Sequence, residues 1–380
     1  LTDLIPPHER FYAVAGEKII FKTADLIKSS KKPLILLGAG ANRKEARRAI
    51  SDFINKTKIP FCNTQMGKGS VDESSDYFLG TAALSDKDYL HDYIRAADLI
   101  INIGHDVVEK PPFFMEHGGA SVIHINYKSA QVDQVYFPQV EVIGDIALSM
   151  DALADCFALD TSFALEKFSQ VRDLVRNMTT ASLENTSFPP KPQHLVAQIR
   201  QSMGYHDIIT LDNGVYKIWF ARNYPAFQPN TILLDNALAT MGAGLPSAMT
   251  AAMLYPKRKV MAICGDGGFM MNSQELETAV RLKLNLVVLI LNDSSYGMIR
   301  WKQAGMGFKD WGLEYDNPDF SMYAKSYGVT PHNIHENDSL PLVIDEAFNA
   351  GGVHLIDLPV DYTDNVKNLI SDLAEHEPVI

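Results

Sequence analysis

The amino-acid sequence predicts an α/β protein of two tandem domains, each built on a parallel Rossmann-like or doubly wound sheet. Three observations lead to this prediction. The chain has 380 residues, which is enough for two domains with separate cores. Its strongest apolar runs are short and unbroken, as expected of strands that are buried on both faces. Helical patterns follow several of these runs, and such alternation is typical of a layered parallel sheet.

The first series of elements occupies a predicted central domain, residues 17–158, after a short linker at residues 1–16. Its strands are expected at residues 33–40, 98–104, 121–126 and 140–145. Amphipathic helices are expected at residues 42–54 and 145–157. Residues 159–190 contain one helical stretch and then Ser, Thr, Asn and Pro, so an interdomain linker is predicted there.

The second series occupies a predicted domain at residues 191–380. Its strands are expected at residues 207–212, 231–235, 259–265, 285–292 and 353–359. Two of them end in an acidic motif, "GDG" at Asp266 and "ND" at Asp293. Parallel sheets bind ligands at the carboxyl ends of their strands, so both carboxylates are expected at one edge. Mg²⁺ prefers about six oxygen ligands. A single motif of this kind would favour the interpretation of its aspartate as a turn or helix-cap residue, but the pair, each after a buried strand, favours a metal site.

Charge and composition exclude several kinds of partner. The formal net charge is −12 and the pI is about 5.4, so neither a nucleic-acid nor an anionic-membrane surface is expected. The widely spaced Cys62, Cys156 and Cys264 indicate neither a disulfide framework nor a zinc site. No apolar run approaches the length of a membrane span, and a cytoplasmic protein is expected.

The segment that joins the two motifs resembles the fingerprint of thiamine-diphosphate-dependent enzymes. Residues 265–299 read "GDGGFMMNSQELETAVRLKLNLVVLILNDSSYGMI", with 24 residues, 268–291, between "GDG" and "ND". The resemblance is closest to the acetolactate synthase (acetohydroxyacid synthase large-subunit) branch. Within it, the catabolic FAD-independent enzymes also carry Asp at the second position, where the wider family more often has Asn.

The resemblance implies a set of ligands for the metal and the cofactor. Mg²⁺ would be held by Asp266, Asp293 and the carbonyl of Ser295. The implied thiamine-diphosphate contacts are Gly265, Gly267, Gly268, Val215, Tyr216, Ala239, Met241 and Met298. Met241, in "NALATMGAGLPSAM", stands where the family wedges an apolar side chain under the bent cofactor. The bend brings an internal base close to the carbon that it deprotonates. For an isolated methionine, core packing is the alternative.

A substrate pocket is implied by "YGMIRWKQ", which is similar to the helix that lines the family's pocket. Met298, Trp301 and Gln303 are its candidates, and an amphipathic core helix is an equally good interpretation. The family's activating glutamate belongs to an N-terminal pyrimidine domain, so no catalytic residue is assigned in this chain. We expect the chain to be a fragment of the enzyme that is inactive alone.

The glycines of the central domain invite a dinucleotide-binding interpretation. "LLGAGANR" places Gly38 and Gly40 between a strand and a helix, but Arg43 stands at the third glycine position. The family's biosynthetic members bind FAD in this domain with an Arg-Phe-Asp-Asp-Arg segment. The corresponding residues 103–114, "IGHDVVEKPPFF", lack it, so no FAD is expected.

The function implied is that of a transferase of branched-chain amino acid biosynthesis, an acetolactate synthase that decarboxylates pyruvate and joins it to a second 2-keto acid. A homo-oligomer, dimer or tetramer, is implied as well. The alternatives are another thiamine-diphosphate decarboxylase or carboligase, a non-catalytic cofactor-binding module, and a Mg²⁺-dependent phosphatase with Asp266 as nucleophile.

Two smaller patterns are structural. Residues 272–275, "NSQE", predict a helix N-cap at Asn272, and Glu277 with Arg281 predicts a solvated ion pair.

Overall fold

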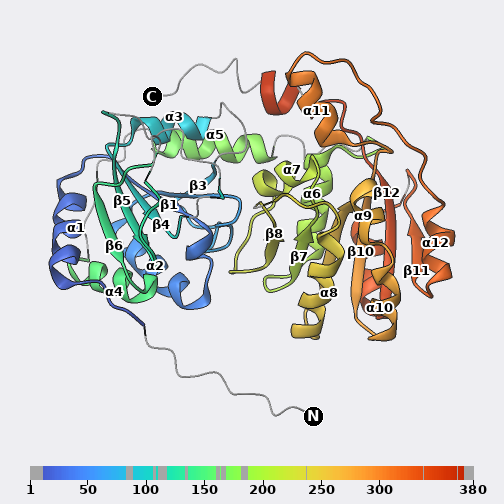
Figure 1. Cartoon of the computed structure of the whole chain (residues 1–380), viewed down its shortest axis with the longest axis horizontal. Helices are drawn as coiled ribbons and strands as arrows, with labels where there is room; N and C mark the ends of the chain where they lie inside the picture. The colour runs from blue at the N-terminus through green and yellow to red at the C-terminus, as the bar shows by residue number, and fades with distance from the viewer. Residues whose placement is uncertain are drawn as a thin grey trace, which may run out of the picture.

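The chain folds into two parallel sheets of six strands that lie side by side, each with helices on both faces (Figure 1). The computed structural model describes residues 12–82, 89–105, 108–109, 118–132, 136–159, 163, 168–180, 187–236, 238–336, 338–365 and 367–371. The predicted fold, α/β with two tandem domains, is confirmed. The predicted linkers, residues 1–16 and 159–190, lie partly outside the described residues.

The first sheet has the strand order β3-β2-β1-β4-β5-β6, and all its pairs are parallel. Its strands are β1 (Pro33–Leu37), β2 (Phe61–Asn63), β3 (Phe78–Thr81), β4 (Leu99–Ile103), β5 (Ser121–Asn126) and β6 (Val140–Ile143). The strand order reverses direction between β1 and β4. In such a sheet the loops after these two strands leave toward opposite faces, which is where ligands usually bind.

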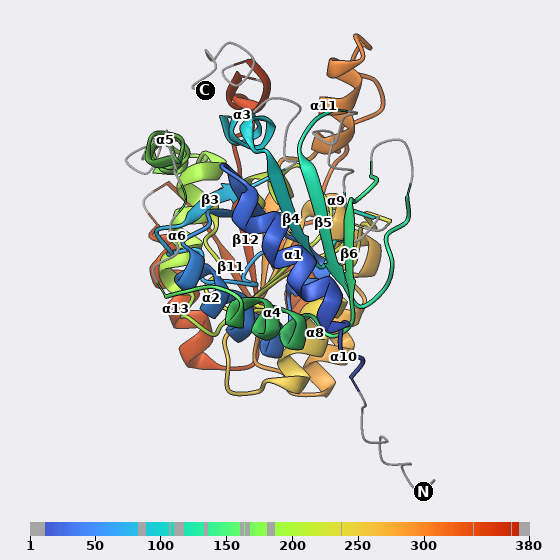
Figure 2. The ribbon, with the colours of Figure 1, turned by 90° about the vertical axis from the view of Figure 1, so that its left-hand side faces the viewer.

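Alternate residues of these strands point to opposite faces of the sheet and belong to two separate apolar cores. Ile35 and Ile101 face the core shared with α1 (Glu17–Ser29), α2 (Lys44–Thr57) and α4 (Ile146–Asp155). Figure 2 shows α1 and α4 together on this face. Leu34 and Ile100 face the core shared with α3 (Tyr89–Ala96) and α5 (Phe168–Thr180). The single-turn η1 (Ala39–Ala41) follows β1.

The second sheet has the order β11-β12-β10-β9-β7-β8, again all parallel. Its strands are β7 (Ile208–Leu211), β8 (Ile232–Leu234), β9 (Val260–Gly265), β10 (Leu286–Asn292), β11 (Thr330–Asn333) and β12 (Val353–Pro359). The order reverses between β7 and β9, so the loops after these strands diverge there.

Helices cover both faces of this sheet as well. One face packs on α6 (Pro192–Ser202), α7 (Tyr216–Asn223) and α13 (Leu340–Ala350). The other packs on α8 (Gly244–Leu254), α9 (Asp266–Asn272), α10 (Glu275–Arg281) and α12 (Phe320–Ser326). The remaining helical elements are α11 (Gly297–Gly305) and the π-helical turn η2 (Lys367–Ser371). No helix among the described residues is long and apolar enough to cross a membrane.

A buried ion pair of the first domain, Lys68 with Glu73, also bonds to the second domain. The Glu73 carboxylate accepts Lys68 Nζ at 2.8 Å and, from the second domain, the backbone N–H of Ala226 at 2.9 Å. Asn63 Nδ2 and the N–H of Gly69 donate to its other oxygen at 2.8 and 3.1 Å. Because every lone pair of this carboxylate meets a donor, the buried charge is compensated.

Two local predictions have opposite outcomes. The N-cap at Asn272 is wrong: α9 runs through Asn272, α10 begins at Glu275, and its N-cap is Gln274 without a side-chain cap. The Asn272 side chain instead donates to the carbonyl of Gly242 at 2.8 Å. The solvated pair is confirmed, since Arg281 Nε lies 3.0 Å from Glu277 Oε1 and both side chains are more than half exposed.

Candidate cofactor and metal site

A groove lies where the loops after β7 and β9 diverge, and most of the predicted site residues line it. Its lining is Asn213, Gly214, Val215, Tyr216, Met241, Gly265, Asp266, Gly267, Gly268, Leu291, Asp293, Ser295, Tyr296, Gly297, Met298, Ile299, Tyr315 and Tyr362. Three predicted residues, Ala239, Trp301 and Gln303, are absent from this lining. Trp301 packs against the core of the second domain, as the core-helix interpretation of α11 expects.

Asp266 is the most completely held side chain of the groove. It follows β9 and is only 1% exposed. One carboxylate oxygen accepts from Tyr315 Oη and from the N–H of Gly267, both at 2.8 Å. The other accepts from the N–H of Ser294 and from Asn317 Nδ2, both at 2.7 Å. Four donors therefore fix this carboxylate on the groove, where its negative charge acts on a second aspartate.

Asp293 faces that charge from the end of β10. Burial, and then the nearby charge of Asp266, raise the pKa of Asp293 to about 7. Close beside it, Ser295 is buried and its Oγ has no hydrogen-bond partner in the described part of the chain. Two carboxylates that repel each other at a buried site, with further oxygens nearby, are a donor set for a hard divalent cation.

No cluster of three or more His, Cys, Asp and Glu side chains able to hold a metal occurs among the described residues. The predicted set does not require one, because it combines two carboxylates with the Ser295 backbone carbonyl. Ser295 pairs as an antiparallel bridge with Glu314, in the segment that also carries Tyr315. This segment therefore lies along the metal-site residues. The assignment of Asp266, Asp293 and Ser295 to Mg²⁺ stays a prediction.

The glycines of the groove are needed because side chains approach them closely. A Cβ on Gly267 would lie 2.6 Å from Tyr315 Oη, and one on Gly268 would lie 2.7 Å from Asp212 Oδ2. Tyr216 is buried, and its hydroxyl accepts the N–H of Gly265 at 2.9 Å. Any larger residue at 267 or 268 would displace these neighbours.

The loop that carries Met241 is braced on both sides. Before Met241, Asn213 Nδ2 donates to the carbonyl of Thr240 at 2.8 Å. After it, the N–H of Gly242 donates to both oxygens of Asp212 at 2.8 and 2.9 Å. Gly242 has a φ of +89°, a conformation that favours glycine. The loop thus presents Met241 to the groove from a fixed backbone.

A buried lysine extends this bracing. Lys217 Nζ donates to Asn213 Oδ1 at 2.7 Å and to the carbonyl of Asp235 at 2.6 Å. Burial lowers the pKa of Lys217 to about 8. Ala239 also belongs to this loop and has a φ of +48°, but its side chain is exposed.

Sequence reasoning missed several residues that hold the site together: Asp212, Asn213, Lys217, Asn272, Tyr315 and Asn317. One signal was available. Asp212 follows strand β7 as Asp266 follows β9, and a glycine stands within two residues after each of them. For Tyr315 and Asn317 the sequence contains no such signal, because a long loop brings them back to Asp266.

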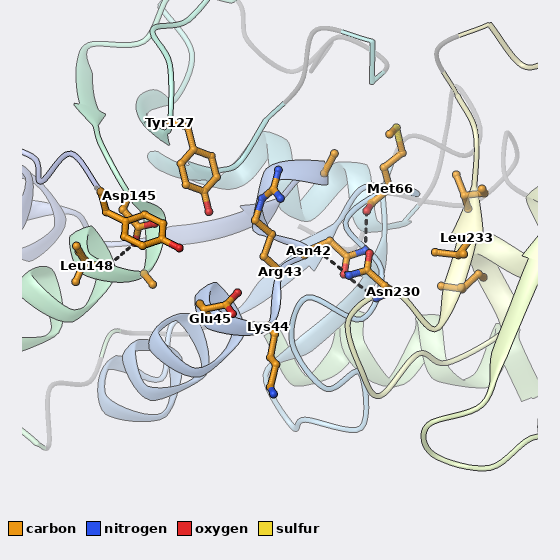
Figure 3. Close-up of a pocket in the computed structure, with 15 residues that line it drawn as sticks. Asn42, Arg43, Lys44, Glu45, Met66, Tyr127, Asp145, Leu148, Asn230 and Leu233 are labelled. Atoms are coloured by element: carbon orange, nitrogen blue, oxygen red, sulfur yellow. Dashed lines mark hydrogen bonds between the residues drawn. The ribbon is translucent and has the colours of Figure 1, made fainter. Parts of the chain in front are cut away.

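The structure has two further cavities. A polar cavity of about 460 Å³ shares Asp293 and Tyr315 with the groove and is lined by Ser294, Arg300, Glu314, Asp316 and Asn317 as well. A larger one, about 950 Å³, lies between the domains (Figure 3). Arg43 lies over the ring of Tyr127 there, 5.3 Å from its centroid. On the other side of Arg43, Asn42 accepts the N–H of Asn230 at 3.1 Å. None of the predicted site residues lines this larger cavity.

Comparison with known proteins matches both domains. Residues 20–153 match the family model "Thiamine pyrophosphate enzyme, central domain", and residues 212–358 match "Thiamine pyrophosphate enzyme, C-terminal TPP binding domain". The chain is 32% identical over 368 residues to an acetolactate synthase of Bacillus subtilis (strain 168), covering 96% of the chain and 64% of the relative. It is 29% identical over 355 residues to a catabolic acetolactate synthase of Raoultella terrigena, covering 92% and 64%. The chain thus spans less than two thirds of the length of these relatives.

Proposed function

Because the chain belongs to the thiamine pyrophosphate enzyme family, we propose that the groove between the ends of β7 and β9 binds thiamine diphosphate and Mg²⁺ for an acetolactate synthase reaction. The observation that carries this proposal is the pairing of buried Asp266 with half-buried Asp293 at neighbouring strand ends, with Met241 on the same groove.

The residues present fit a magnesium ion. Four hydrogen bonds hold the Asp266 carboxylate in place, and burial followed by the charge of Asp266 raises the pKa of Asp293. A divalent cation between them offsets the repulsion and the desolvation of both carboxylates. In this assignment Asp266, Asp293 and the Ser295 carbonyl hold the metal. A carboxylate in place of the more common asparagine at position 293 binds Mg²⁺ more strongly and slightly repels the diphosphate.

The residues also fit the cofactor. Gly267 and Gly268 line the groove, and Met241 offers an apolar surface on a braced loop. When bound, thiamine diphosphate supplies an electron sink for decarboxylation of a 2-keto acid. The apolar side chain of Met298 lines the same groove and would help to keep water from the reacting carbon, which would favour carbon–carbon bond formation over protonation.

The substrates in this proposal are pyruvate and a second 2-keto acid, which yield 2-acetolactate and CO₂. The names of the relatives support this reaction, as does the chain's similarity to a catabolic acetolactate synthase. We place the activating glutamate outside this chain and assign the active enzyme a homo-oligomeric state. The whole protein's activity therefore rests on residues beyond those of the groove.

Calorimetric titration of thiamine diphosphate into the chain, with Mg²⁺ and with EDTA, tests the cofactor site. We expect Mg²⁺-dependent binding in the wild type and its loss in Asp266→Ala. Asp316→Ala is the matched control, because it removes an exposed carboxylate of the adjoining cavity that is outside the proposed ligand set. Equal binding with EDTA, or full binding by Asp266→Ala, contradicts the proposal.

The reaction itself is tested by product analysis with pyruvate, after the protein is supplied with the domain that carries the activating glutamate. Acetolactate supports the synthase assignment. Acetaldehyde instead identifies another decarboxylase of the family, and binding without any product identifies a non-catalytic module.

A further inference from the structure

The first sheet has the strand order of dinucleotide-binding domains, with its reversal between β1 and β4. In sheets of this order a dinucleotide lies at the reversal, and its phosphates meet the glycine loop that follows the first strand. Gly38, Ala39 and Gly40 form that loop here. The loop therefore has the position of a phosphate site, and its immediate neighbours decide whether an anion can enter.

The loops after β1 and β4 lie in direct contact. The N–H of Gly40 donates to the carbonyl of Gly104 at 2.7 Å, and the N–H of Gly38 donates to the carbonyl of Ile103 at 2.8 Å. Gly104 has a φ of +71°, and a Cβ there would lie 2.2 Å from the backbone nitrogen of Ala41. Two of the loop's N–H groups are therefore already used inside the protein.

The side chain of Glu109 accepts a hydrogen bond from the third N–H group of the loop, that of Ala39. Its two carboxylate oxygens lie 3.2 and 3.3 Å from the N–H of Ala39, and one of them also accepts the hydroxyl of Thr64. Glu109 is only 2% exposed, and a Cβ on Gly38 would lie 2.7 Å from its Oε2. His105 Nδ1 lies 4.0 Å from the same oxygen. The carboxylate thus lies where the loop would meet a phosphate oxygen.

We propose that Glu109 is a built-in anion that occupies the phosphate site of the glycine loop and excludes dinucleotides, FAD included, from the first domain. Two effects act together. The carboxylate takes the Ala39 N–H that a phosphate needs, and its oxygens occupy the space beside Gly38 where a phosphate oxygen would lie. This inference goes beyond the proposed function and does not depend on it, because Glu109 and the groove of the second domain belong to different sheets.

Space for a ligand is present beside the loop, on the side of Ala39. The cavity of about 950 Å³ in Figure 3 begins at Ala39 and is large enough for a nucleotide-sized ligand. Arg43 and Lys44 also line it, so its charge is not uniformly negative. Removal of the Glu109 carboxylate should accordingly free the Ala39 N–H to bind an anion from this cavity. Glu109 lies within residues 103–114, where the family's FAD-binding segment is missing, and part of that stretch lies outside the described residues.

Inorganic phosphate is the probe, and the backbone amide resonance of Ala39 in the whole chain is the readout. In the wild type we expect no saturable shift of this resonance, and no binding of FAD by flavin fluorescence. In Glu109→Ala we expect a saturable phosphate-dependent shift of Ala39. Glu45→Ala, which removes an exposed carboxylate from the same cavity, should behave as the wild type. Because Ala39 reports only on the glycine loop, phosphate binding in the second domain does not affect the result.

Saturable binding of phosphate at Ala39, or of FAD, by the wild type overturns the proposal, and so does a folded Glu109→Ala variant whose Ala39 resonance does not respond. If Glu109→Ala fails to fold, Glu109→Asp keeps the charge but shortens its reach by one methylene. Hydrogen exchange of the Ala39 amide should then be about tenfold faster than in the wild type, since one buried hydrogen bond is weakened. Unchanged exchange in Glu109→Asp also overturns the proposal.

Discussion

Both oxygens of the Asp212 carboxylate accept the backbone N–H of Gly242, although Asp212 is fully buried. Burial raises the pKa of Asp212, and backbone donors from Asn213, Gly242 and its neighbours oppose that effect. The carboxylate at the end of β7 thus fixes the turn before α8. Met241 precedes that turn, so its position on the groove depends on Asp212.

Replacing Asp212 tests this dependence. Asp212→Ala should weaken thiamine-diphosphate binding by about tenfold or more, because it removes a charge-assisted hydrogen bond to the loop. Asp212→Asn keeps one oxygen acceptor and should lose less. Inorganic pyrophosphate, titrated in the same calorimeter, does not reach Met241 and should bind almost unchanged. Equal losses for both ligands would show that Asp212 maintains the whole groove instead of this loop.

Asp293→Asn should raise the Mg²⁺ concentration needed for cofactor binding by about tenfold, because one of two ligand charges is removed while an oxygen remains. At saturating Mg²⁺ the cofactor should still bind. The measurement is a Mg²⁺ titration at fixed thiamine diphosphate, with Asp316→Asn as the control of the same charge change. An unaltered Mg²⁺ requirement in Asp293→Asn would place the metal elsewhere.

Lys68→Met should destabilise the protein strongly. It leaves Glu73 buried without its cation, and breaking such a pair costs about 3–5 kcal/mol of unfolding free energy. Arg281→Ala is the matched control, since it breaks an exposed pair that contributes at most about 1 kcal/mol. Thermal and urea unfolding, followed by circular dichroism, compare the two. Similar losses in both variants would mean that the Lys68–Glu73 pair adds little.

Protonation of a histidine pair, half-buried His332 and buried His354, should reduce stability in acid. His332 Nε2 lies 2.9 Å from His354 Nδ1 at the edge where β11 joins β12. Burial, and then the neighbouring His354, lower the pKa of His332. The unfolded chain therefore binds this proton at a higher pH than the folded one. The resulting stability is present above the unfolded pKa, near 6.5, and is lost as the pH falls below it.

The test is the melting temperature between pH 7.5 and about pH 5. His332→Gln should reduce the fall in melting temperature over this range, whereas the exposed His206→Gln should leave it unchanged. A fall that is identical in the wild type and in His332→Gln would assign the acid sensitivity to other groups.

Sequence patterns predicted the central strands because full burial demands unbroken apolar runs. β1, β4, β5, β9 and β10 all lie within the predicted ranges, and nearly all their residues are buried. β2, β3 and β11 were not predicted. They have three or four residues each, and β11 is half-exposed and contains a proline. Such short strands form because a neighbouring strand is already in place, and no local pattern records that neighbour.

The sequence alone determined the α/β class, the two domains and the acidic residues that follow β9 and β10, because these depend on local runs of residues and on the rule that parallel strands end at one edge. Tertiary structure alone decided which groups meet there. Tyr315 and Asp266 are 49 positions apart, and Glu109 is 70 positions from Ala39. These contacts depend on the packing of loops, whose paths follow from the buried surface and hydrogen bonds of the entire fold.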